Sequence, residues 1–313
     1  MLLKKTDERT NRLALLEDLQ RSNLLDMRQK KWLRDELLRL RKGIQGERDS
    51  AYFLDQYFKD GENHVVLHDL RFVIDGDVAQ IDHLIINRGN GIYLIETKNY
   101  AGNVSINAHG EFTVEYETER IGIESPIEQS QRHERVLHRL LDRLEISPRT
   151  GGPLPCHHLV MFHSKAIITR PAASAFDTSN VIKADQFPSW HQKFVNKEWG
   201  YGTFFKVAAN LRSQNTIKEW GERLVRQHRP ANQLDLPSFM LPAAEPRRCP
   251  PAAKPSNIST RPPIVDAVAA PEDAAPLCPT CRSAMVRRTA KKGINAGVQF
   301  WGCAQYPGCR GTR

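Results

Sequence analysis

The chain has 313 residues, of which 40% are hydrophobic, enough for one sizeable core and a smaller accessory module. No stretch approaches the roughly 18 uninterrupted apolar residues of a membrane span, and the charged first residues do not match a signal peptide. The sequence therefore argues against membrane and secreted classes. Four of its six cysteines lie in the last 36 residues at zinc-like spacing, which indicates a reducing cytoplasm. The 45 Lys and Arg exceed the 36 Asp and Glu and give a net charge of +9, which suits a polyanionic partner such as nucleic acid.

Residues 1–42 alternate charged residues with leucines and contain neither Gly nor Pro. This pattern predicts one or two amphipathic helices. The leucine spacing is too irregular for a coiled-coil seam, so we expect the helices to pack against the following domain. Contact with a protein partner is the alternative use of this segment.

Residues 43–230 alternate strand-like and helix-like patterns, which is typical of an α/β domain. Its first helix contains GIQGERDSAYFLDQYF, in which Ala51, Leu54 and Phe58 recur at helical spacing. Glu47 lies one turn before Ala51 on the same predicted buried stripe.

Two strand-like runs, VAQIDHLII and IYLIETK, flank a turn at residues 87–91. In an antiparallel pair, counting outward from this turn places Asp82 opposite Glu96, and the strand period of two places Lys98 on the same face. Opposed anions on an apolar face repel one another and lose hydration. A divalent cation removes both costs, and Mg²⁺ prefers such oxygen ligands. The alternative is a salt bridge of Lys98 with one of the carboxylates.

A second helix is predicted at SPIEQSQRHERVLHRLL, with Ser125 as N-cap, Pro126 at the first position and Glu128 completing a capping box. Gln129 and His133 head its buried stripe. For His133, a hydrogen-bonded place at the edge of the core is the alternative to a functional role.

Two other polar sets receive simpler interpretations. The arginines of this second helix recur every three or four residues and are expected to form a solvated face, with contact to a nucleic-acid backbone as the alternative: Arg132, Arg135, Arg139 and Arg143. The trio Cys156, His157 and His158 lies before a core strand, LVMF, and is assigned neither metal binding nor catalysis.

Four blocks, GERD, QIDHLI, IETKN and SPIEQSQRH, occur in an order that resembles the nuclease-related domain, a branch of the PD-(D/E)XK restriction-endonuclease-like superfamily. The resemblance covers about residues 40–150. It implies a mixed sheet flanked by helices and a DNA nuclease, used in DNA processing or repair, that depends on Mg²⁺ or Mn²⁺. Asp82 and Glu96 would bind the metal, Glu47 would be the acid of the first helix, and Lys98 the lysine of the acid-x-lysine element.

The pair Gln129 and His133 is similar to the Gln-x-x-x-Tyr element of some superfamily members. His133 replaces the tyrosine, which makes it a substrate-contact residue at most, and Ile81 stands where the superfamily name has proline. Neither change removes a metal ligand. A catalytically silent DNA-binding adaptor is the alternative function, and the presence of every acid and of Lys98 favours the enzyme.

Residues 231–277 contain ten prolines and ten alanines, which predicts an extended linker. Residues 278–313 are too few to bury a core without a metal. Cys278-x2-Cys281 and Cys303-x5-Cys309 have the spacing of a four-thiolate ribbon around one structural Zn²⁺.

The tail holds seven Lys or Arg, no acid, and interleaved aromatic residues, a surface that can bind phosphates and stack on bases. Its sequence resembles the C-terminal zinc finger of bacterial type I topoisomerases, which implies binding of single-stranded or structured DNA. The residues expected to bind DNA are Arg287, Arg288, Lys291, Lys292, Phe300, Trp301 and Tyr306.

Overall fold

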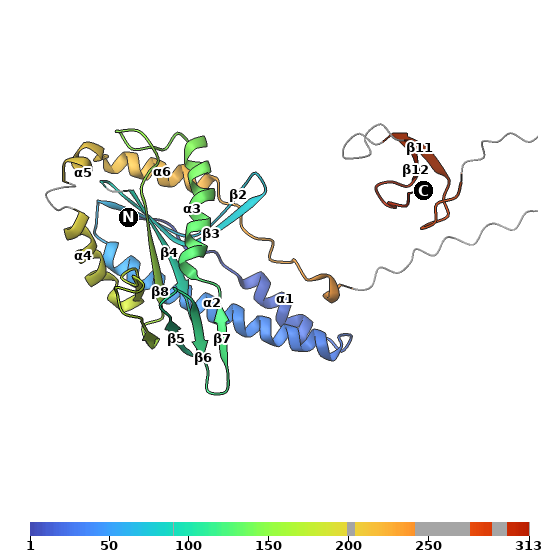
Figure 1. Ribbon diagram of the computed structural model, residues 1–313, viewed down its shortest axis with the longest axis horizontal. Helices are drawn as coiled ribbons and strands as arrows, with labels where there is room; N and C mark the ends of the chain where they lie inside the picture. The colour runs from blue at the N-terminus through green and yellow to red at the C-terminus, as the bar shows by residue number, and fades with distance from the viewer. Residues whose placement is uncertain (90, 199–203, 242–275, 290–298, 313) are drawn as a thin grey trace, which may run out of the picture. The chain divides into compact units, whose positions relative to one another are not determined.

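A computed structural model describes residues 1–89, 91–198, 204–241, 276–289 and 299–312. The chain divides into two compact units, residues 1–245 and 246–313. The larger unit holds the main sheet and its helices, and the smaller holds a two-stranded hairpin (Figure 1). None of the helices in the described part of the chain has the length and apolar character needed to cross a membrane.

The larger unit is built on a six-stranded mixed sheet in the order β1-β2-β3-β4-β8-β10. Its strands are β1 (Leu2–Lys4), β2 (His64–Ile74), β3 (Asp77–Asn87), β4 (Gly91–Lys98), β8 (Cys156–Phe162) and β10 (Val181–Lys183). Strands β2, β3 and β4 are antiparallel, whereas β1, β8 and β10 join their neighbours in parallel. The predicted α/β class with a mixed sheet is therefore confirmed.

The β2–β3 turn is formed by Asp75 and Gly76, whose φ angles of 53° and 88° lie in the left-handed region that Gly and Asp tolerate best. Strands β3 and β4 pair with Leu84 opposite Leu94, which is the register counted from the sequence.

Helices cover both faces of the main sheet. One face packs against α3 (Pro126–Arg143) and α6 (Gln214–Arg226), and the other against α2 (Met27–Phe58) and α4 (Phe187–Glu198). The 3-10 turn Ala184–Gln186 contributes Ala184 to the second of these layers. A short helix, α5 (Phe204–Asn210), precedes α6 in the chain. Helix α3 crosses the central strands (Figure 1).

The start of α3 follows the sequence prediction with one correction. Ser125 is the N-cap and its hydroxyl accepts a hydrogen bond from the Glu128 amide, with Pro126 in the first turn. The reciprocal bond that would complete a capping box is absent between these two described residues. A complete capping box is present at the start of α2, between Asp26 and Gln29.

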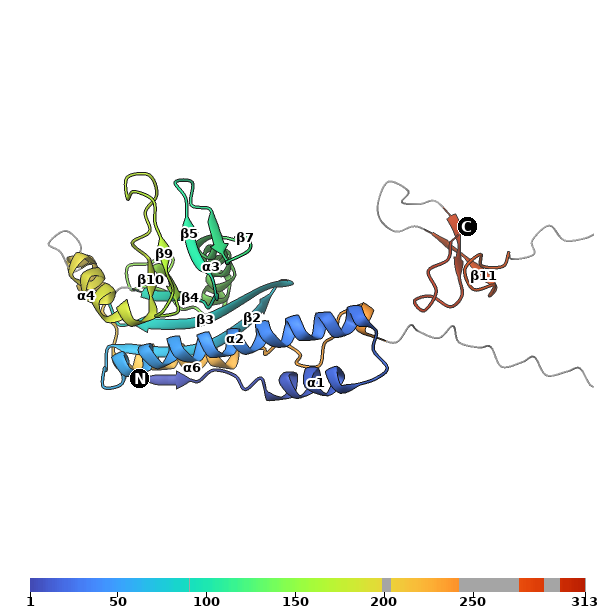
Figure 2. The same cartoon turned by 90° about the horizontal axis from the view of Figure 1, so that it is seen from below.

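A second, four-stranded sheet has the order β7-β6-β5-β9. Its strands are β5 (Asn103–Ile106), β6 (Phe112–Glu115), β7 (Arg120–Ile123) and β9 (Ile168–Thr169). Apolar residues of β5 and β6 pack on Val160 and Phe162 of β8. This sheet lies on the same side of the main sheet as α3 (Figure 2).

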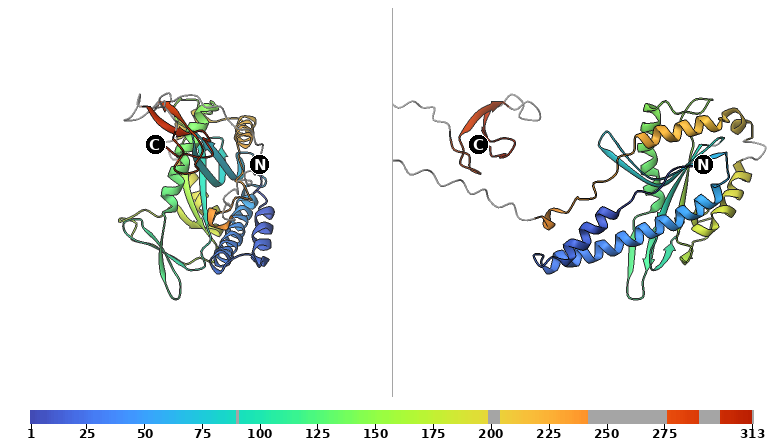
Figure 3. Two further views of the ribbon diagram at one scale, coloured as in Figure 1. Left: turned by 90° about the vertical axis from the view of Figure 1, so that its right-hand side faces the viewer. Right: turned by 180° about the vertical axis from the view of Figure 1, so that it is seen from behind.

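The predicted N-terminal boundary differs from the structure. Residues 1–42 supply β1 and α1 (Thr10–Arg21), but α2 runs through residue 42 without a break. Leucines of α1 pack on Leu33 and Leu37 of α2, so the leucines join the two helices to each other. Figure 3 shows α1 alongside α2.

The predicted linker also begins too early. Residues 231–241 pack on the α1–α2 pair, where Met240, in the 3-10 turn Ser238–Met240, is buried among leucines and Phe239 contacts Trp32 edge-on. These apolar side chains, although flanked by prolines, complete the helical core. Residues 242–275 of the predicted linker lie outside the described residues.

The smaller unit pairs β11 (Met285–Thr289) with β12 (Gln299–Cys303) in antiparallel fashion. Among the described residues of this unit, the buried side chains are those of Cys278, Met285 and Cys303. A core of three side chains cannot stabilise such a unit alone, which agrees with the prediction that the thiols hold a metal.

Candidate functional site

Four elements of the larger unit bring the predicted polar residues together where the pairing of β3 with β4 ends. Helix α2 supplies Glu47, β3 supplies Asp82, β4 supplies Glu96 and Lys98, and α3 supplies Gln129 and His133. The paired register ends at His83 opposite Ile95, so Asp82 and Glu96 follow directly after the last pair.

Asp82 is held by the backbone of the neighbouring strand. The Thr97 amide donates a hydrogen bond of 2.7 Å to Asp82 Oδ2. Burial raises the pKa of Asp82 to about 6 in spite of this bond, and the negative charge of Asp69 adds to the rise. The side chain is therefore fixed in direction and costly to ionise without a nearby cation.

Glu96 and Glu47 show the same electrostatic conflict more strongly. Glu96 is only 4% exposed. Burial first, and then the charge of Asp82, raise the pKa of both glutamates to about 8. Three carboxylates thus share a poorly solvated region, where a bound cation would lower the free energy of all three.

Lys98 lies between β4 and α3. Its Nζ donates to Glu96 Oε1 at 2.8 Å and to Gln129 Oε1 at 2.9 Å. Burial lowers the pKa of Lys98, but the charge and hydrogen bond of Glu96 outweigh it and raise the pKa. Lys98 is therefore a fixed positive charge, and Gln129 positions it.

His133 is near the carboxylates but is not a cation. Its Nδ1 lies 3.9 Å from Glu96 Oε2. Burial, followed by the charges of Arg132 and Lys98, lowers the pKa of His133 to about 4. A neutral imidazole can donate or accept a hydrogen bond but cannot neutralise a phosphate at neutral pH.

Two residues that the sequence interpretation missed complete the site. Arg9 donates to both oxygens of Glu47, at 2.9 and 3.1 Å, and to Asp69 Oδ2 at 3.2 Å. Asp69 is 5% exposed and its φ is 52°, a left-handed residue in the middle of β2. A carboxylate within the apolar run of β2 was a usable signal for Asp69. Arg9 carries no local signal, because its partners are 38 and 60 residues away.

A buried chain of hydrogen bonds supports Asp82 from the other face of the sheet. His83 Nε2 contacts Thr97 Oγ1 at 3.0 Å, His83 Nδ1 contacts His68 Nδ1 at 2.8 Å, and His68 Nε2 contacts Asp55 Oδ1 at 3.0 Å. Thr97 is the residue whose amide holds Asp82. The chain of contacts thus locks β2, β3 and β4 together directly behind the carboxylate.

The carboxylate site fits a hard divalent cation by its chemistry, since its donors are oxygens with unfavourable mutual repulsion. Among the described residues, two groups of at least three Cys, His, Asp or Glu have donor atoms within 4.8 Å of one another, and these three carboxylates are neither of them. Lys98 and Arg9 instead contact Glu96 and Glu47 directly. A metal at this site therefore has to compete with the protein's own cations.

Two of the arginines predicted to form a solvated face of α3 make ion pairs with acids of the β2–β3 turn. Arg139 pairs with Asp77 at 2.5 Å, and Arg143 pairs with Asp75 at 2.6 Å. Both contacts tie α3 to the β2–β3 turn.

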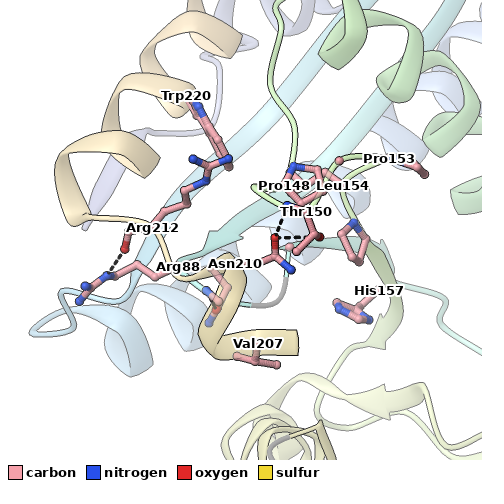
Figure 4. Close-up of a pocket in the computed structure, with 15 residues that line it drawn as sticks. Arg88, Pro148, Thr150, Pro153, Leu154, His157, Val207, Asn210, Arg212 and Trp220 are labelled. Carbon is pink, nitrogen blue, oxygen red and sulfur yellow. Dashed lines mark hydrogen bonds between the residues drawn. The ribbon is translucent and has the colours of Figure 1, made fainter. Parts of the chain in front are cut away.

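A pocket of about 440 Å³ lies at the opposite end of β4 and β8 (Figure 4). Its lining includes Arg88, Asn210, Arg212 and Trp220, and Arg88 Nε donates to the Arg212 carbonyl at 2.7 Å. The lining includes none of the predicted catalytic residues, so the pocket is separate from the carboxylate site.

The smaller unit brings the four predicted zinc ligands together. The Sγ atoms of Cys278, Cys281, Cys303 and Cys309 lie within 4.8 Å of one another. Cys278 and Cys309 are 3.8 Å apart, and Cys281 and Cys303 are 3.3 Å apart. Tetrahedral zinc with sulfur ligands separates them by about 3.8 Å, so the set fits a structural Zn²⁺.

Arginines and aromatic rings share one hairpin of this unit. Arg287 lies over the Trp301 ring at 5.3 Å, and Arg288 over the Tyr306 ring at 5.4 Å. A groove of about 780 Å³ is lined by Arg288, Phe300, Tyr306 and Arg310, among others. The two predicted lysines, Lys291 and Lys292, lie outside the described residues.

Comparison with known protein families gives one match: residues 42–163 fit the model of the nuclease-related domain. The matched segment spans the second half of α2, strands β2 to β8 and helix α3, and it contains all six predicted site residues of the core. No curated protein and no solved structure matches the chain.

Proposed function

We propose that residues 42–163 form a restriction-endonuclease-like core that hydrolyses phosphodiester bonds in DNA with Mg²⁺ or Mn²⁺. The observation that carries the proposal is the joint placement of Glu47, Asp82 and Glu96 beside Lys98 in a buried site whose carboxylates are strained by like charge. The matched nuclease-related domain supports the same activity.

In this proposal the three carboxylates hold the metal ion. When bound, the ion would supply Lewis acidity to the scissile phosphate and lower the pKa of the attacking water. Lys98, kept protonated by Glu96, offsets the negative charge that grows on the scissile phosphate. It does not act as a base.

Helix α3 contributes orientation. Gln129 keeps the Lys98 ammonium in place through its 2.9 Å hydrogen bond. His133, neutral near pH 7, is suited to a hydrogen bond with a phosphate or sugar oxygen. Both residues lie within one turn of the helix, so a small shift of α3 would displace them together.

The C-terminal unit is proposed to be a topoisomerase-type zinc ribbon that binds single-stranded or structured DNA. The four adjacent thiols support a structural zinc ion. The arginine-over-aromatic pairs offer positive charge and exposed ring faces to phosphates and bases. Zinc-bound thiols are compatible with a reducing compartment such as the cytoplasm, and the proposed role is DNA processing or repair.

One observation favours a second candidate, a DNA-binding adaptor that does not cut. Arg9 pairs with Glu47 and Asp69 through three hydrogen bonds, and such internal neutralisation would weaken metal binding. In the enzyme a divalent ion would displace Arg9 from these carboxylates, whereas in the adaptor Arg9 would stay bound to them.

The test is cleavage of a panel of single-stranded, branched and duplex DNA by the purified full chain with Mg²⁺ or Mn²⁺, and with EDTA. Metal-dependent cleavage that Glu96→Gln abolishes would support the enzyme. DNA binding without cleavage of any substrate under these conditions would favour the adaptor.

A further inference from the structure

A second group of metal-ligating side chains lies between α3 and β8, away from the carboxylate site. Glu134, His138 and Cys156 each direct one donor atom to within 4.8 Å of the others. The proposed nuclease mechanism uses none of them, and the sequence interpretation gave Cys156 no metal role.

The fold places these residues together by simple geometry. Glu134 and His138 are one turn apart on α3 and share a face of the helix. Cys156 and His158 are two residues apart at the start of β8 and share a face of the strand. Glu134 joins the two elements, since its Oε1 lies 3.2 Å from His138 Nε2 and its Oε2 lies 3.1 Å from His158 Nε2.

A buried hydroxyl fixes the orientation of His158. Ser130 Oγ lies 2.8 Å from His158 Nδ1, and Ser130 is 3% exposed. This contact turns His158 Nε2 toward Glu134. Partners of this kind orient the ligands of metal sites. The side chains of Glu134 and His138 are 27% and 25% exposed, so an ion can reach them from solvent.

We propose that Glu134, His138 and Cys156 bind a zinc-class transition metal ion, with a water ligand in the fourth position and His158 positioning Glu134. The donor set of one oxygen, one nitrogen and one sulfur suits zinc and related ions, whereas Mg²⁺ and Ca²⁺ prefer oxygen alone. The ion fastens α3 to β8 one turn beyond Gln129 and His133.

The structure does not favour an activated cysteine nucleophile at this place. The thiol of Cys156 is directed to the Leu154 carbonyl oxygen at 3.8 Å.

Zinc content of the purified full chain tests this site separately from the ribbon. We expect about two zinc ions per chain in the parent, and about one in either His138→Ala or the double variant Cys278→Ser/Cys281→Ser. Combining all three changes should remove both ions. His109→Ala, at an exposed histidine, is the matched control and should retain about two.

Cobalt substitution identifies the ligand directly. In a full chain with all four ribbon cysteines changed to serine, added Co²⁺ should give a thiolate-to-metal charge-transfer band that Cys156→Ser abolishes. Cys249→Ser should leave the band unchanged. His138→Ala should weaken it while the far-ultraviolet circular dichroism stays parental, which separates loss of metal from loss of fold. The proposal would be overturned if the charge-transfer band did not form, or if His138→Ala contained as much zinc as the parent. Neither result depends on whether the core cleaves DNA.

Discussion

The carboxylate site and the four-cysteine cluster are both suited to cations, but they differ in how the protein supports them. Around the carboxylates, Lys98 and Arg9 contact the acids directly, and an extensive sheet core holds the site. The four thiols lie against one another, and two of them are themselves most of the buried core of their unit. The difference indicates that the fold around the carboxylates would be independent of a bound metal, whereas the fold of the four-cysteine unit would depend on one.

The largest expected effect within the carboxylate site, short of removing a metal ligand, comes from Lys98. Lys98→Ala should lower the turnover rate roughly 10²–10³-fold because a charge aimed at the transition state is lost, with little change in DNA affinity. Single-turnover cleavage and filter binding on the same DNA separate the two quantities. If Lys98→Ala instead lowered DNA affinity by such a factor and left the turnover rate unchanged, Lys98 would be a binding residue only.

The variant Glu96→Gln tests whether repulsion between the carboxylates destabilises the metal-free protein. The folded-state pKa of Glu96, about 8, is raised above its ordinary value. Its contribution to stability is therefore fully present below the ordinary pKa and is lost as pH rises through about 8. In EDTA, the free energy of unfolding of Glu96→Gln should match that of the parent in acid. As the pH rises toward 8 it should exceed the parent's by up to about 5 kcal/mol, because each pKa unit of the rise is worth about 1.4 kcal/mol. Urea unfolding at several pH values measures this, and a pH-independent difference would contradict the strain.

Removing two of the ribbon thiols should unfold the four-cysteine unit and leave the carboxylate site intact. Cys278→Ser/Cys281→Ser should lower single-strand affinity about tenfold and reduce the salt slope by roughly 2, since the arginine contacts to phosphates are lost with the zinc. Cleavage at saturating DNA should persist. Cys249→Ser is the control for thiol loss. Unchanged affinity and slope would exclude DNA binding by the ribbon and leave it as a contact for another protein.

The smallest expected effect comes from Arg9, the protein's own cation beside Glu47 and Asp69. Arg9→Gln should strengthen Mg²⁺ binding several-fold, because Glu47 and Asp69 lose their positive partner. Calorimetric titration measures this, with Arg12→Gln, whose side chain contacts Glu36 instead, as the control. Weaker Mg²⁺ binding in Arg9→Gln would show that Arg9 supports the site and does not compete with the metal.

Local patterns allowed several features to be predicted from the sequence. The β3–β4 register follows from counting outward from one turn, the start of α3 from Ser125 and Pro126, and the thiol cluster from cysteine spacing. These features depend on residues close together in the chain. The placement of Lys98 beside Glu96 belongs to the same group.

The residues that sequence reasoning missed depend on long-range packing. Arg9 reaches its partners only because β1 pairs with β2 and directs the following segment along the sheet. The contact of Ser130 with His158 spans 28 residues and requires α3 to cross β8. The packing of residues 231–241 on α1 and α2 contradicts a composition that favours a linker, since a few apolar side chains outweigh the prolines.

The most direct test of the central claim is Mg²⁺-dependent DNA cleavage by the full chain carrying Asp82→Asn, compared with Asp77→Asn at the exposed start of the same strand. The asparagine can still accept the Thr97 hydrogen bond, so the strand should keep its place. We predict that Asp82→Asn loses cleavage on the order of 10³-fold or more, because a ligand of the metal is removed, while Asp77→Asn keeps the parental rate. Parental cleavage by Asp82→Asn would contradict the assignment of the metal to this site.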